Sequence, residues 1–136
     1  MAMMAGYLQK AIFQALNSEN AITALIGVDN IFDHEIKDAI YPYISIDNWE
    51  TFDWSTDSEF GEEHLFDVLI YEDKPARENL QNIAQKVVSA LHDQPLTLDV
   101  GVLINLRFES ASFAEEGRNK LQTARLKFRA KIEYNT

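Results

Sequence analysis

The fold is decided near the end of the chain by the stretch Ala124-Arg125-Leu126-Lys127-Phe128-Arg129-Ala130-Lys131-Ile132-Glu133-Tyr134. Its apolar residues occupy the even positions and its charged residues the odd positions. Such alternation is typical of a β-strand with one face in the core and the other in water. The stretch therefore predicts a strand that needs a covering layer on its apolar face, and whose opposite face carries Arg125, Lys127, Arg129 and Lys131.

The most regular apolar pattern of the chain predicts that covering layer. Its positions fall at spacings of three, one, three, one and three residues: Leu80, Ile83, Ala84, Val87, Val88 and Leu91. This spacing forms a stripe along one face of a helix. We expect the helix to begin at Asp73 or Lys74, with Pro75 in its first turn, where a missing N–H is tolerated. A second amphipathic helix is predicted over residues 6–18, and a short one that ends at Gly27.

The rest of the chain predicts further strands. We expect a first strand over residues 41–47, then a strand and a mobile loop over 49–63, and a very short strand around Ile31 and Phe32. Apart from His64 and Asp67, residues 64–71 are apolar at both odd and even positions, as in a central strand covered on both faces. A strand over 102–109 alternates, with a buried face formed by Val102, Ile104, Leu106 and Phe108.

These elements predict one α+β domain over residues 1–136. A turn is expected at residues 114–117, so that the last two strands pair antiparallel. The order of helices and strands indicates an antiparallel or mixed β-sheet with helices packed on one face. A chain of 136 residues with 46% hydrophobic content is long enough for one core and needs no second domain.

Composition excludes several kinds of chemistry. The chain has no cysteine, which removes thiol nucleophiles, zinc–thiolate sites and iron–sulfur clusters. No stretch approaches the roughly 20 apolar residues of a membrane span, and the first residues lack the pattern of a signal peptide. We therefore expect a soluble protein with no membrane partner. The net charge of -10 opposes non-specific binding to nucleic acid or anionic lipid.

Charge is unevenly distributed along the chain. Between Asp38 and Asp73 there are 11 acidic residues and no lysine or arginine, whereas residues 118–132 carry six cations and no carboxylate. In one interpretation, the two surfaces neutralise each other within a subunit. In the other, each subunit offers its positive surface to the negative surface of a neighbour, in a head-to-tail contact that can close into a ring.

No motif of catalysis or metal binding is present in the sequence. The three histidines have no metal-ligand spacing, and the five glycines form no phosphate-binding loop. Carboxylate pairs such as Glu62 with Glu63, or Asp53 with Asp57, arise by chance among 22 acidic residues. We expect no catalytic residue, no metal and no cofactor. Aromatic side chains between residues 49 and 60 are interleaved with acids, which argues against base stacking and favours a protein contact or a flank of the sheet.

From about Leu8 to Tyr134 the chain resembles the tail terminators, small tail-completion proteins of long-tailed bacteriophages, prophages and gene transfer agents. The resemblance rests on the order and spacing of these segments: helix 8–16, Leu25-Ile26-Gly27, Tyr41-Pro42-Tyr43-Ile44, strand 64–71 followed by the long helix, Ala90-Leu91-His92-Asp93, and Thr123-Ala124-Arg125-Leu126-Lys127-Phe128-Arg129.

The resemblance implies a non-enzymatic structural role in the virion. Such proteins form a hexameric ring in the tail and neck region, cap the tail tube at full length, and present the surface that joins the head connector or stopper protein. DNA passes through the ring without being specifically bound, and assembly takes place in the cytoplasm of the bacterial host. Two alternatives remain: another neck component, such as a head-closure or stopper protein, and a small acidic binding module unrelated to viruses.

Two candidate surfaces follow from this role, and neither rests on a family motif. The candidate subunit interface is the basic face Arg125, Lys127, Arg129 and Lys131. The candidate tube or lumen loop consists of Trp49, Phe52, Asp53, Trp54, Asp57, Glu59 and Phe60.

Overall fold

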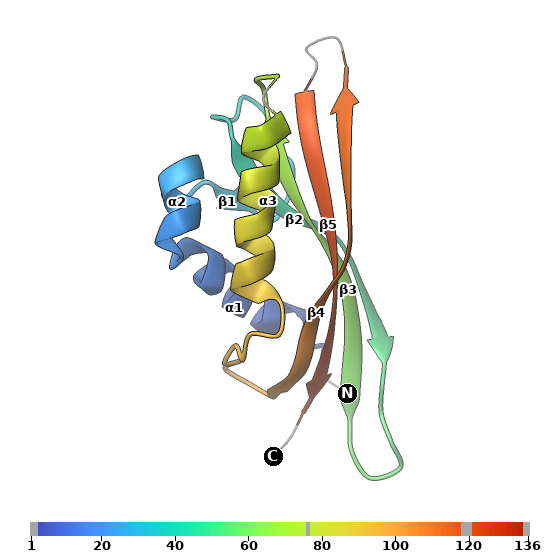
Figure 1. The fold of residues 1–136 in the computed structure, drawn as a ribbon. Coiled ribbons are helices and arrows are strands. Elements are labelled where there is room, and N and C mark those ends of the chain that lie inside the picture. The colour runs from blue at the N-terminus through green and yellow to red at the C-terminus, as the bar shows by residue number, and fades with distance from the viewer. Residues whose placement is uncertain (1–2, 76, 118–120, 135–136) are drawn as a thin grey trace.

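The computed structural model describes residues 3–75, 77–117 and 121–134, and Figure 1 shows helices on one side of a twisted sheet. The described elements are α1 (Ala5–Asn17), α2 (Asn20–Ile26), β1 (Ile31–Phe32), β2 (Tyr43–Asp53), β3 (Gly61–Glu72), α3 (Arg77–Leu91), β4 (Val102–Glu116) and β5 (Leu121–Glu133). The sheet order is β1-β2-β3-β5-β4, with β1 parallel to β2 and every other pair antiparallel. The predicted α+β class, with a mixed sheet and helices on one face, is confirmed.

The core lies between α3 and the apolar face of β5. Every even residue of β5 from Ala124 to Ile132 is buried, and so are Leu80, Ile83 and Val87 of α3. The ring of Phe128 stacks on Phe66 of β3 at 5.6 Å between centroids. The alternation of β5 and the stripe of α3 therefore meet as predicted, because each supplies the apolar surface that the other must bury.

The central position predicted for residues 64–71 is also correct. β3 lies between β2 and β5, and its other face is covered in part by the segment before β2. Tyr43, Leu69 and Tyr71 form a small second core there, packed against Phe32 and Ile36. The outer face of the sheet is therefore apolar at this end and charged along the rest of its length.

The predicted buried face of β4 is wrong at its first two positions. Val102 and Ile104 are 42% and 43% exposed, and Leu103 packs against the core instead. The cause is a β-bulge, because Leu103 pairs with Ile132 and Asn105 with Lys131, which leaves Ile104 as an extra residue. Side chains N-terminal to the bulge therefore point to the opposite face from the one that strict alternation predicts.

Three predicted boundaries also differ from the structure. Residues 61–63 belong to strand β3 and not to a loop before it, and residues 114–116 belong to β4 and not to a turn. The described part of α3 begins at Arg77 and not at Asp73 or Lys74. The buried carboxylate of Glu72 explains the last difference, because it accepts hydrogen bonds from the backbone N–H groups of Asp73 and Lys74 and holds them in a turn.

Candidate assembly surfaces

The outer face of the sheet places the acidic stretch beside the basic strand. β3 and β5 pair along their whole length, with Asp67 opposite Lys127 and Glu63 opposite Lys131. Charges that are distant in the sequence are therefore cross-strand neighbours on one surface, where opposite signs attract. This pairing supports the interpretation in which the acidic and basic surfaces neutralise each other within one subunit.

Three of the four predicted interface cations contact groups of their own chain. Arg129 donates from Nε to Glu109 at 2.8 Å and lies 2.8 Å from Glu63 through a terminal nitrogen, and these carboxylates raise the pKa of Arg129. Nε of Arg125 lies 3.6 Å from Asp67, and Nζ of Lys131 lies 5.0 Å from the centroid of Trp54. Within the described residues Lys127 makes no ion pair shorter than 4.0 Å. Use of this face in a subunit contact stays a prediction.

The structure divides the predicted tube or lumen loop between a strand and a hairpin. Trp49, Phe52 and Asp53 lie on β2, whereas the other four residues, Trp54, Asp57, Glu59 and Phe60, lie in the connection from β2 to β3. Trp49 is part of the core flank, since its ring stacks on Phe66 at 4.5 Å. The hairpin residues are exposed and project at the end of the sheet that holds both described chain ends (Figure 1).

Internal hydrogen bonds organise the hairpin from residue 54 to residue 60. The N–H of Trp54 donates to the carbonyl of Gly61 at 2.9 Å, and the N–H of Thr56 donates to that of Glu59 at 2.8 Å. Gly61 is required at the base of the hairpin, because a Cβ there would lie 2.8 Å from the carbonyl oxygen of Trp54. Phe60 and Trp54 remain 60% and 37% exposed, so the hairpin presents apolar surface to solvent.

A buried polar network lies at the base of this hairpin, and no pattern in the sequence predicts it beyond the presence of the polar residues themselves. Glu62 is buried and accepts three hydrogen bonds: from the N–H of Met4 at 3.0 Å, from Nε2 of His64 at 3.1 Å, and from the hydroxyl of Tyr134 at 2.7 Å. Burial raises the pKa of Tyr134 to about 12, and the hydrogen bond to Glu62 adds to this. The network connects both ends of the described chain to β3, which is a structural and not a catalytic arrangement.

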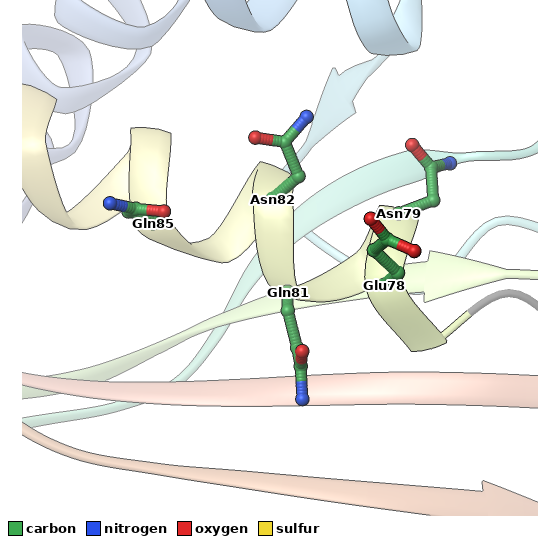
Figure 2. A pocket seen from close by; sticks show the side chains of 5 residues that line it. All are labelled: Glu78, Asn79, Gln81, Asn82 and Gln85. Atoms are coloured by element: carbon green, nitrogen blue, oxygen red, sulfur yellow. The ribbon is translucent and has the colours of Figure 1, made fainter.

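A polar hollow of about 660 Å³ lies along the exposed side of α3, and Figure 2 shows the side chains that line it. All of them come from this one helix: Glu78, Asn79, Gln81, Asn82 and Gln85. Asn79 is already engaged, since its Nδ2 donates to Glu72 at 2.8 Å. A single carboxylate among amides offers no pair of acid and base for catalysis.

Residues 3–75, 77–117 and 121–134 contain no group of three or more histidine, cysteine or acidic side chains placed to hold a metal ion. In the same ranges no helix combines the length and the apolar character that a bilayer span requires. The features that distinguish the molecule are therefore its charged sheet face, its exposed hairpin and its strand edges.

Comparison with known proteins identifies the family of the chain. The family model described as tail completion protein gp17 matches residues 10–133. A solved chain from the virion of a native gene transfer agent particle is similar in structure, with a TM-score of 0.88 and 26% sequence identity, over 98% of this chain and 99% of that chain. No curated protein sequence matched the chain. The chain therefore belongs to the tail completion protein gp17 family, and it is a structural, non-enzymatic tail protein.

Proposed function

We propose that this protein is a tail terminator that assembles into a ring, caps the tail tube when the tube reaches full length, and ends its polymerisation. The observation that carries this proposal is the similarity over nearly the whole chain to a protein of a gene transfer agent virion, together with the tail completion family. The exposed hairpin and the open sheet edges are surfaces available to neighbouring subunits.

The proposed partners are further copies of the chain, six in a ring, the tail tube protein on one side, and the head–tail connector or stopper protein on the other. The net charge of -10 suits a ring through which DNA passes, because an acidic lining repels the polyanion and prevents it from binding. The protein would then reside in the tail and neck region of the virion after assembly in the cytoplasm of the bacterial host.

The experiment is deletion of the gene in the strain that produces the particles, followed by electron microscopy of the tails. We expect tails of uncontrolled length without heads, and restoration of uniform tails by the gene supplied in trans. Tails of normal length that merely lack heads would instead assign the protein to head closure. Unchanged, fully assembled particles would contradict both roles.

A further inference from the structure

The sheet has an unpaired edge on each side. Among the residues that the structure describes, β4 is the last strand and pairs only with β5. On the other side, β1 pairs only with Ile44 and Ser45 of β2, so residues 46–53 of β2 have no strand partner there among the described residues. A groove of about 410 Å³ follows this edge of β2, lined on the strand by Ile46, Asp47, Trp49 and Thr51. Long unpaired edges are templates for pairing with another chain.

The directions of the two edge strands suit a head-to-tail contact. Three successive antiparallel pairings separate β2 from β4, so the two strands run in opposite directions. A rotation about an axis parallel to the strands keeps the direction of β2 in the next copy. The next copy therefore places its β2 beside β4 of the first copy, with the two strands antiparallel, and the same contact repeats around a ring.

The two edges are also in matching register. Following the pairings across the sheet, Ile46 lies level with Ala111, Asp47 with Ser110, and Phe52 with Asn105. One bulge interrupts β2 between Asp47 and Glu50, and another interrupts β4 between Phe108 and Ser110. Each bulge adds one residue at the same level, so one step along the β2 edge corresponds to one step along the β4 edge over this whole stretch.

The charges at the two edges are complementary. Glu50 lies level with Arg107, through Leu65 of β3 and Arg129 of β5, and all four share the outer face of the sheet. Glu50 is exposed and forms no ion pair within the described residues, while Arg107 is paired only with the exposed Asp93, at 3.3 Å. Phe52 and Ile104 are 44% and 43% exposed at neighbouring levels of the same edges, and would bury apolar surface against each other.

We propose that β4 of one copy pairs antiparallel with the open edge of β2 in the next copy, and that Arg107 and Glu50 form an ion pair across this contact. The inference rests on the proposed ring and names the surfaces that close it. A second copy of this chain is the occupant, because direction, register and charge match between two edges of the same molecule. The sheets of all copies then form one continuous antiparallel layer around the ring.

Cysteine cross-linking tests the register without disturbing the ion pair. The chain has no native cysteine, so every disulfide reports on the introduced positions. Opposite residues of an antiparallel pair have Cα atoms about 4.5–5.5 Å apart, which is within disulfide range. Particles are assembled with the D47C/S110C variant as their only copy of the protein, oxidised mildly, and analysed on non-reducing gels.

We expect a ladder of covalent oligomers that ends at the number of copies in the ring. The single variants D47C and S110C should remain monomeric, and so should the control D47C/Q85C, whose second cysteine lies on the exposed side of α3. A dimer from S110C alone would show β4 paired with β4 and would overturn the proposal. Absence of the ladder from assembled particles would overturn it as well.

Charge exchange provides a second test, which does not depend on disulfide geometry. E50R and R107E should each reduce incorporation into particles at least fivefold, and E50R/R107E should restore it to near the wild-type level. Failure of the double variant to restore incorporation, with all three variants folded by circular dichroism, would overturn the ion pair. If deletion of the gene leaves tails unchanged, the proposed function fails; if deletion disrupts tails but neither test succeeds, only the edge pairing fails.

Discussion

Nε1 of Trp49 donates a hydrogen bond of 2.9 Å to Nδ1 of His64, whose side chain has no exposed surface. Since Nδ1 accepts this bond, the proton of the neutral imidazole belongs on Nε2, which then donates to Glu62. Burial lowers the pKa of His64, and the adjacent Glu62 opposes this only in part. The indole, the imidazole and the carboxylate thus hold the base of the hairpin together with His64 uncharged.

The first prediction concerns the stability at mildly acidic pH. Because the pKa of His64 is lower in the folded state than its unfolded value near 6.5, the unfolded chain binds the proton first as the pH falls. Folding stability should therefore decrease below about pH 6.5 through this residue and be independent of it above that pH. Urea unfolding from pH 8 to pH 5 measures the free energy of unfolding of the wild type and of His64→Gln. The wild type should lose stability relative to His64→Gln as the pH falls. Parallel pH curves would contradict the assignment.

The second prediction concerns the core between β3, β5 and β4. Phe128 is fully buried, stacks on Phe66 and meets Phe108 edge-on at 5.8 Å. Phe128→Ala should lower the free energy of unfolding by about 3–5 kcal/mol. Phe60→Ala removes the same ring from an exposed site and should change it by less than about 0.5 kcal/mol. Equal losses in chemical denaturation would show that the exposed ring is part of the core.

The third prediction compares two glycines. Gly101 has a φ of +88°, and a Cβ there would lie 2.5 Å from Cε of Met4 and 3.0 Å from the carbonyl oxygen of Glu133. Gly101→Ala should therefore cost about 1–3 kcal/mol through backbone strain and crowding. Gly6 in α1 has open space around the same position, so Gly6→Ala should be neutral or stabilise by up to about 1 kcal/mol. Thermal unfolding of both variants provides the comparison, and a harmless Gly101→Ala would be the contrary result.

The fourth prediction tests the basic face of β5 as a subunit interface. Lys127→Glu leaves the contacts of Arg125 with Asp67 and of Arg129 with Glu63 and Glu109 in place, so it should weaken self-association at a cost in stability of about 1 kcal/mol or less, which comes from the like charge of Asp67 opposite it. The triple variant that also carries Arg125→Glu and Arg129→Glu should weaken it further and lose stability, since Arg129 no longer bonds Glu63 and Glu109. Light scattering after a sizing column, at low and high salt, measures the mass. An unchanged mass at every concentration would remove this face from the interface.

The fifth prediction tests the hairpin as a contact with the tail tube or lumen. Trp54→Ala and Phe60→Ala should leave the protein folded and lower its incorporation into tails, because these exposed aromatic side chains supply apolar contact area. Val28→Ala, which truncates a side chain that is 74% exposed elsewhere, serves as the control. Incorporation is measured from the amount of protein in purified particles. Equal incorporation of all three variants would exclude the hairpin from that contact.

Sequence periodicity was sufficient for the elements that form the core. Local apolar patterns predicted both these elements and their buried faces, because each apolar position in the pattern corresponds to a buried side chain. The patterns are the alternation in β5, the apolar stripe of α3, and the apolar residues at both odd and even positions of β3. Periodicity failed at Ile104, because a bulge depends on the pairing partner and leaves no local signature. The same limit applies to the turn at Glu72, whose carboxylate binds N–H groups that precede the helix.

The sequence by itself determined the α+β class, the pairing of the last two strands, and the absence of thiol chemistry, since these depend on composition and on spacing between near neighbours. Only the tertiary structure decided which charges meet, because the partners of Arg129 are brought together by strand pairing across the sheet. It also decided the network at Glu62, which joins this residue to Met4, 58 positions before it, and to Tyr134, 72 positions after it. The tertiary structure likewise decided that Glu50 and Arg107 lie at the same height on opposite edges of the sheet, since this follows from three successive strand registers.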